Sequence, residues 1–244
     1  GRANRPSILW NFDDCHGSQY DAFATNFQPY KIYPSYQVTS DLIDNPTYIT
    51  SAQLQELQAS GCSINVHAQT HAALTSLTQA GVESELTTCM DFLRALGITG
   101  YRLGSYPTGA FNDTVLTACA NVGMLAMRSL QAAQDTVSGD TVMPSNLQQE
   151  QRYFGVAHKY KINSMGLGAS VSAASVITEI RKAVTRQADL FIYAHAFVAS
   201  GAAGPEYNLT DVDTINTEIV RLRSQGLIDT PNYEEWYSKV EFYE

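Results

Sequence analysis

Short apolar runs alternate with amphipathic segments along most of the chain. The run SILWNFD at 7–13 is continuously apolar and then abruptly polar, as expected of a strand buried within a sheet. Residues 78–97 instead carry apolar side chains at helical spacing and end at Gly97, a typical helix stop. The same criteria predict further strands at 31–39, 62–69, 101–107, 124–130, 152–162 and 190–197, and further helices at 50–61, 112–123, 172–187 and 211–226.

Strands that alternate with helices predict a parallel sheet covered by helices, hence an α/β barrel or a doubly wound α/β fold. Residues 131–150 are rich in Gln, Ser, Asp and Thr and are expected to form a surface loop. No repeat or linker divides the sequence, and 244 residues suit one large domain that covers the whole chain. The abrupt ends, GRANRP and KVEFYE, suit a domain cut from a longer chain.

The charge balance excludes one class of partner. The formal net charge is −9 and the 15 Lys and Arg residues form no cluster, whereas nucleic-acid binding depends on basic side chains that neutralise phosphates. No apolar run approaches the roughly 20 residues that span a bilayer, so we expect no transmembrane segment. The four cysteines lack CxxC spacing and are expected to be buried small apolar side chains rather than zinc ligands or disulfides: Cys15, Cys62, Cys89 and Cys119.

Polar side chains gather where three of the predicted strands end. Asp13 and Asp14 end the first strand, His67 and His71 follow the run CSINV, and His195 lies in FIYAHAF. Because the carboxyl ends of parallel strands meet on one face of an α/β fold, where active sites are built, these side chains are expected to meet in space. Two imidazoles and one carboxylate form a common catalytic ligand set for zinc, and other divalent ions accept the same ligands.

Each of these features has an ordinary structural explanation when taken alone. An Asp pair can cap a helix, and an H-x-x-x-H pair can consist of one core histidine and one exposed histidine. These explanations would have to coincide at three strand ends of one sheet. The pattern as a whole therefore favours a metal site.

Four short segments stand in order between residues 11 and 197: NFDDC, HAQTH, YRLGSYPTGAFND and FIYAHAF. Together they resemble the motifs of the polysaccharide deacetylases, carbohydrate esterase family four. The resemblance implies a distorted (β/α) barrel with fewer than eight full repeats. It also implies a hydrolase that removes N- or O-linked acetyl groups from a polysaccharide. Such an enzyme would use a divalent metal ion, with Zn²⁺ preferred over Co²⁺, Ni²⁺ or Mn²⁺, and would act outside the cell, at its surface or on a virion.

The resemblance further implies a role for each matching residue. Asp13 would be the general base, Arg102 would orient it and keep it ionised, and His195 would be the general acid. A backbone N–H near Thr108 would complete an oxyanion hole. The metal ligands would be Asp14, His67 and His71. Three aromatic residues are candidates for stacking on a sugar ring, although ordinary packing is the commoner reason for such residues: Trp10, Tyr106 and Tyr193.

The sequence departs from the family pattern at several positions. Ala68 replaces a Ser or Thr that braces the metal loop through hydrogen bonds. Extra residues separate Arg102 from the proline of its motif, which leaves Arg128 as a rival partner for the base. The strand at 124–130 lacks the Asp and Trp of the family's fourth motif. Because that Trp commonly walls the acetyl pocket, an atypical substrate preference is expected.

Two other functions stay open at this point. One is a hydrolase of small non-peptide C–N bonds on the same fold. The other is a non-catalytic carbohydrate-binding or adhesion module of a larger surface or virion protein. All five residues that the chemistry needs are present, which favours catalysis on an acetylated glycan. The sequence specifies no oligomeric state.

Overall fold

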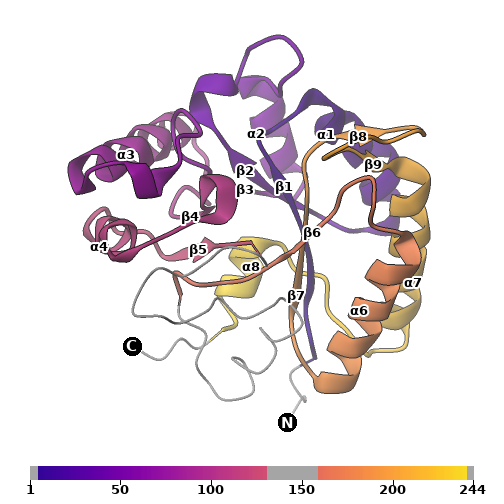
Figure 1. The fold of residues 1–244 in the computed structure, drawn as a ribbon. Coiled ribbons are helices and arrows are strands. Elements are labelled where there is room, and N and C mark those ends of the chain that lie inside the picture. The colour runs from indigo at the N-terminus through magenta and orange to yellow at the C-terminus, as the bar shows by residue number, and fades with distance from the viewer. Residues whose placement is uncertain (1–4, 131–158, 241–244) are drawn as a thin grey trace.

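Seven parallel strands form a curled sheet at the centre of the molecule (Figure 1). The structure is a computed structural model and describes residues 5–130 and 159–240. The strand order across the sheet is β5-β4-β3-β2-β1-β7-β6. The bounds are β1 Ile8–Asp13, β2 Ser35–Val38, β3 Ser63–Val66, β4 Leu103–Ser105, β5 Ala126–Arg128, β6 Met165–Gly166 and β7 Leu190–Ala194. A separate two-stranded parallel sheet consists of β8 Phe197–Val198 and β9 Tyr207–Asn208.

An irregular segment, rather than an eighth full strand, closes the sheet into a distorted barrel. Ile162 forms a parallel bridge with Arg128 of β5, and Met165 pairs with Ile192 of β7. Residues 162–166 therefore span the gap between the two edges of the sheet. The predicted fold class, a distorted (β/α) barrel of parallel strands with outer helices, is confirmed.

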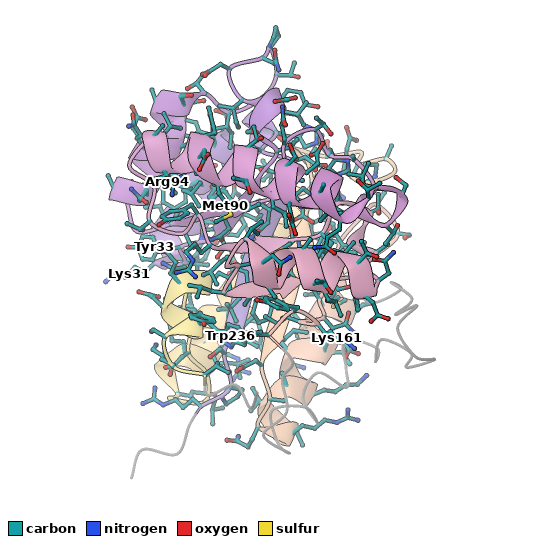
Figure 2. The ribbon with its side chains drawn as sticks, turned by 90° about the vertical axis from the view of Figure 1, so that its left-hand side faces the viewer. Lys31, Tyr33, Met90, Arg94, Lys161 and Trp236 are labelled. Carbon is teal, nitrogen blue, oxygen red and sulfur yellow. The ribbon has the colours of Figure 1, made fainter. Side chains whose placement is uncertain are left out.

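Helices cover the outside of the barrel. Figure 2 shows α3 and α4 side by side on one flank, with Trp236 below them, and Figure 1 shows α6 and α7 on the opposite flank. The bounds are α1 Gly17–Ala22, α2 Ser51–Ala59, α3 Gln79–Ala95, α4 Asp113–Asn121, α6 Ala173–Arg186, α7 Leu209–Ser224 and α8 Tyr233–Tyr237. Five of these helices begin at a side chain that accepts a hydrogen bond from the first turn: Thr50, Thr78, Asn112, Ser172 and Asn232.

Most of the predicted elements have a counterpart in the structure. Residues 131–150 and 152–158 lie outside the described residues, so the predicted loop and most of the predicted strand at 152–162 are not addressed. Of that strand, Ile162 makes a β-bridge. Sequence analysis missed four short features, because each is too brief to show a periodic pattern: α1, α8, β6 and the β8–β9 pair.

The four cysteines are buried and free, as predicted. Within residues 5–130 and 159–240, none of the helices combines the length and the apolar character that crossing a membrane requires.

Alternate positions along the strands face two different environments. On β1 the even-numbered residues pack in the core between the sheet and the outer helices: Ile8, Trp10 and Phe12. Leu9 belongs instead to a smaller apolar cluster inside the barrel, together with Tyr233 and Trp236 of α8. The Trp236 Nε1–H donates to Asp189 Oδ2 just before β7 (2.7 Å). Helix α8 thus closes the barrel at the amino-terminal ends of its strands and leaves the carboxyl ends open for chemistry.

Candidate metal centre and catalytic site

Two acidic residues leave the end of β1 in different directions. Asp13 is the last residue of β1 and continues the inward-facing series of Leu9 and Asn11, where it is buried. The chain then turns through Asp14 and Cys15, whose φ angles of +70° and +56° are left-handed values that residues other than glycine adopt rarely. This turn leaves the Asp14 side chain 18% exposed, at the rim of the barrel.

His67 is held in one orientation by β4. Its Nδ1 lies 3.0 Å from the carbonyl oxygen of Ser105 and 2.7 Å from Ser105 Oγ. With the proton on Nδ1 and donated to that carbonyl, Nε2 keeps its lone pair, an arrangement that metal-ligating histidines commonly use. The Nε2 atom lies 3.5 Å from Asp14 Oδ1.

His71 approaches the same carboxylate oxygen, with its Nε2 atom 3.2 Å from Asp14 Oδ1. One ligand atom each of Asp14, His67 and His71 lies within 4.8 Å of the other two. Asp14 Oδ1 is buried and accepts no hydrogen bond from the part of the chain that the structure describes. Two imidazole nitrogens beside a carboxylate oxygen that lacks a donor fit a divalent cation between them, and this ligand set suits zinc.

The protonation equilibria of this cluster differ from those of free side chains. Burial acts to raise the pKa of Asp14, but the neighbouring imidazoles of His67 and His71 outweigh it and hold that pKa well below its usual range. Asp14 in turn raises the pKa of His71, while burial lowers the pKa of His16. Asp14 is therefore ionised at neutral pH, as a metal ligand must be.

A buried arginine pairs with the second carboxylate. The Arg128 guanidinium forms an ion pair with Asp13, and the side chains are 0% and 3% exposed. Arg128 also donates to Ser164 Oγ (2.9 Å), and its Cζ atom lies 4.9 Å from the centre of the Tyr193 ring. Asp13 therefore lies beside Asp14 but has a different partner. Its carboxylate accepts from the guanidinium and is not part of the Asp14, His67 and His71 cluster.

The predicted role of Arg102 is corrected by this arrangement. Arg102 precedes β4 and donates from Nε to the carbonyl oxygen of Gly123 (2.7 Å). It therefore lies at the amino-terminal end of its strand, away from the face where Asp13 lies. Arg128 instead ends β5 at the carboxyl-terminal face, which is why it reaches Asp13.

Two more imidazoles flank the other oxygen of Asp14. The Nε2 atoms of His195 and His16 each lie 3.9 Å from Asp14 Oδ2. His195 follows β7, its ring 5.6 Å from that of Tyr193, and its buried Nδ1 has no partner among the described residues. The His16 ring stacks on Tyr48 at 5.2 Å. Sequence analysis gave His16 no role, although its place two residues after Asp14 was a usable signal.

Gln19 of α1 is a second residue that sequence analysis missed. Its side-chain amide is buried and donates to the backbone carbonyl oxygens of Asp13 (2.6 Å) and His195. The amide thereby ties the ends of β1 and β7 together, which places Asp13 and His195 on one side of the site.

Two of the predicted sugar-stacking residues belong to the core instead. Trp10 faces the outer helices and donates from Nε1 to Asn216 Oδ1 (3.0 Å). Tyr106 is buried, and its hydroxyl donates to the carbonyl oxygen of Tyr160 (2.9 Å). Neither ring can meet a sugar without unfolding its surroundings. Tyr193 is half-buried on the inner side of β7, next to the catalytic candidates.

Thr108 lies in an exposed turn of 3-10 helix, Pro107–Gly109, with a left-handed φ of +59°. The turn starts beside the site, because the Tyr106 N–H donates to the carbonyl oxygen of Arg128 (3.0 Å). The Thr108 N–H as an oxyanion donor stays a prediction.

Residues 1–127 match the sequence profile of the polysaccharide deacetylase family, a match that covers just over half of the chain. This chain belongs to the polysaccharide deacetylase family. No curated protein matches its sequence. As a family member, this polysaccharide deacetylase is a hydrolase that removes acetyl groups from carbohydrate.

Solved structures of low sequence identity share the fold of this deacetylase. A family 4 carbohydrate esterase from Streptomyces lividans in complex with acetate is 15% identical, with 93% of each chain covered and a TM-score of 0.60. A mutant of a family pseudoenzyme with restored enzymatic activity is 13% identical, with 97% of this chain and 69% of that chain covered and a TM-score of 0.59. The match to a Streptococcus pyogenes deacetylase in complex with acetate is partial: at 22% identity and a TM-score of 0.48 it covers 50% of this chain and 54% of that chain. The chain thus aligns with about half the length of that last protein.

Proposed function

We propose that this chain removes N- or O-linked acetyl groups from a polysaccharide with the help of a divalent cation held by Asp14, His67 and His71. Zn²⁺ is the preferred ion, and Co²⁺, Ni²⁺ and Mn²⁺ are the alternatives. The observation that carries the proposal is the contact set at the end of β1. Asp14 lies against two imidazoles, while its neighbour Asp13 is paired with a buried arginine. Adjacent carboxylates with different partners can do different work.

Asp13 would take the proton of the attacking water, since its carboxylate is held by Arg128 and is free of the imidazole cluster. When bound, the cation supplies Lewis acidity toward water and toward the acyl oxygen. As the new bond forms between the water oxygen and the acyl carbon, His195 would give a proton to the departing nitrogen or oxygen of the sugar. The products are acetate and the free amine or hydroxyl. Tyr193 would support this step by walling the His195 ring on one side.

Metal binding tests the ligand assignment directly. Elemental analysis of wild type should show one equivalent of metal, and the variants His67→Ala and His71→Ala should lose it. Wild-type protein that stays metal-free after incubation with Zn²⁺, Co²⁺ and Ni²⁺ would refute the proposed centre.

Acetate release from a panel of acetylated glycans tests the reaction. Small acetamides belong in the same panel, because their selective hydrolysis would favour a hydrolase of small C–N bonds. Binding of glycans without acetate release from any substrate would favour a non-catalytic module. The panel also decides between N- and O-linked acetyl groups. For location we propose the cell exterior, the cell surface or a virion, on the family resemblance; fractionation of the source material tests it.

A further inference from the structure

The segment that carries the two histidine ligands is not a helix, in spite of its H-x-x-x-H spacing. Ala68 and His71 have left-handed φ angles, both +64°, and residues 67–71 have no regular secondary structure, with a bend at residues 69 and 70. Their backbone N–H and C=O groups therefore lack the partners that a helix would give them. Something else must hold this loop, because both imidazoles depend on it.

The carbonyl oxygens of the loop are held from the side of β2. Thr39 Oγ1 donates to the His67 carbonyl oxygen (3.1 Å). The Ser40 N–H donates to the Ala68 carbonyl oxygen (3.3 Å), and the Asp41 N–H donates to that of Gln69 (3.0 Å). These hydrogen bonds use the carbonyl oxygens of the loop, so the Gln69 and Thr70 N–H groups need a different partner.

That partner is Glu85 of α3. Its Oε2 accepts from the backbone N–H groups of Gln69 (3.0 Å) and Thr70 (2.9 Å), and its Oε1 accepts from Thr70 Oγ1 (2.7 Å). Successive N–H groups that follow a left-handed residue form a concave site for an anion, and here a carboxylate fills it. Bonds from N–H groups to an ionised acceptor are about twice as strong as neutral ones.

Helix α3, which carries Glu85, is itself firmly anchored. The neighbouring residues Val82 and Leu86 are buried in the core, and the helix start is capped by Thr78. The position of Glu85 relative to the sheet is therefore fixed. The hydrogen bonds that its carboxylate accepts from the loop fix the loop relative to β3.

We propose that Glu85 is a positioning residue of the metal centre: its carboxylate holds the bend at Gln69 and Thr70 and so sets His71 against His67 and Asp14. The inference rests on the proposed metal role of these three residues. It also explains how the loop is held although Ala68 has no hydroxyl that could donate a hydrogen bond within it. The hydrogen bonds that hold the loop come from Glu85 of α3 instead.

The test measures Zn²⁺ affinity by competition with a chelator, in the full chain, for Glu85→Ala and Glu85→Gln. Glu83→Ala and Glu83→Gln are matched controls. Glu83 is on the same helix, but its carboxylate accepts from Gln79 and Asn121 rather than from the loop. Removing a group that orients a metal ligand typically costs 10- to 100-fold in affinity. We expect a loss of about that size for Glu85→Ala and a smaller loss for Glu85→Gln, which keeps one acceptor. The Glu83 variants should stay within about twofold of wild type, although they lose the same charge.

Hydrogen exchange of the metal-free protein gives a second readout. The Gln69 and Thr70 amides should exchange faster in Glu85→Ala than in wild type, and at the wild-type rate in Glu83→Ala. Wild-type affinity in Glu85→Ala, or equal losses in the Glu85 and Glu83 variants, would overturn the inference. If His71→Ala retains the metal, the proposed centre itself is wrong. The two failures are therefore distinguishable.

Discussion

Arg128 should be essential both to the stability of the barrel and to its chemistry, whereas Arg102 should be dispensable for the chemistry. The perturbation is Arg128→Met, which keeps an unbranched chain in the same space and removes the charge. Its matched control is Arg102→Met. The two substitutions separate the residue that contacts Asp13 from the one that the sequence motif favours.

The size of the effect follows from burial. Arg128 and Asp13 are 0% and 3% exposed, so the substitution leaves a buried carboxylate without its counter-ion. Breaking a buried pair in this way costs about 3–5 kcal/mol in the free energy of unfolding. The lost bond to Ser164 adds about 0.5–1.5 kcal/mol. Arg102→Met loses one bond to a carbonyl oxygen from a half-buried side chain, which is worth about 1 kcal/mol.

Urea denaturation of both variants and of the double variant Asp13→Asn/Arg128→Met tests this account. The double variant should be at least about 2 kcal/mol more stable than Arg128→Met, because it no longer buries an unpaired charge. Acetate release, normalised to folded protein, should fall by about 10² or more in Arg128→Met, the usual scale for a disabled general base. An Arg128→Met protein within about 1 kcal/mol of wild type, together with an inactive Arg102→Met protein, would refute the reasoning.

Three further predictions concern the carboxylates and imidazoles of the site. Asp13→Asn should lower turnover by about 10² or more while metal content stays at the wild-type level; loss of metal would show that it is a ligand. His195→Ala should cripple hydrolysis of acetamido sugars and spare an activated aryl acetate, whose phenolate leaves unprotonated; equal losses in kcat/KM would remove it from the mechanism. Because Asp14 raises the pKa of His71 above 6.5, the stability that this pair gives the metal-free protein is complete below pH 6.5 and is lost as the pH rises through the raised value. Stabilisation by added Zn²⁺ should instead grow over that range, as the imidazole loses its proton, and Tm against pH for both forms checks the opposite slopes.

The strand ends could be predicted from the sequence, and so could the residues that gather there. A run that is apolar and then acidic, as at Asp13, predicts that a buried strand ends there. What the sequence motif could not give was the arginine that pairs with Asp13. That partner depends on which end of its strand an arginine occupies: Arg102 precedes β4, and Arg128 ends β5.

The alternation of strand residues would have sorted the aromatic candidates as well. Trp10 has the same parity as Ile8 and Phe12, which pack outward, so it could not face the site. Tyr193 has the parity of Phe191, an inward-facing residue, and it is the candidate that lies beside His195. Period two along a strand is exact, so a strand's register, once known, decides which side chains reach a barrel's interior.

The interior of the barrel also explains why a strand buried on both faces contains Asn11. The Gln37 amide, which is in register with Asp13, donates to Asn11 Oδ1 (3.2 Å) and Asn65 Oδ1 (3.4 Å), so that β1, β2 and β3 share a buried polar layer. Such a layer costs stability compared with an apolar core. The inward-facing side chains therefore change along the barrel axis. They are apolar at the end that α8 closes, carry amides in the middle and are charged at the carboxyl-terminal rim. The position of the chemistry is set by that gradient as much as by the motifs.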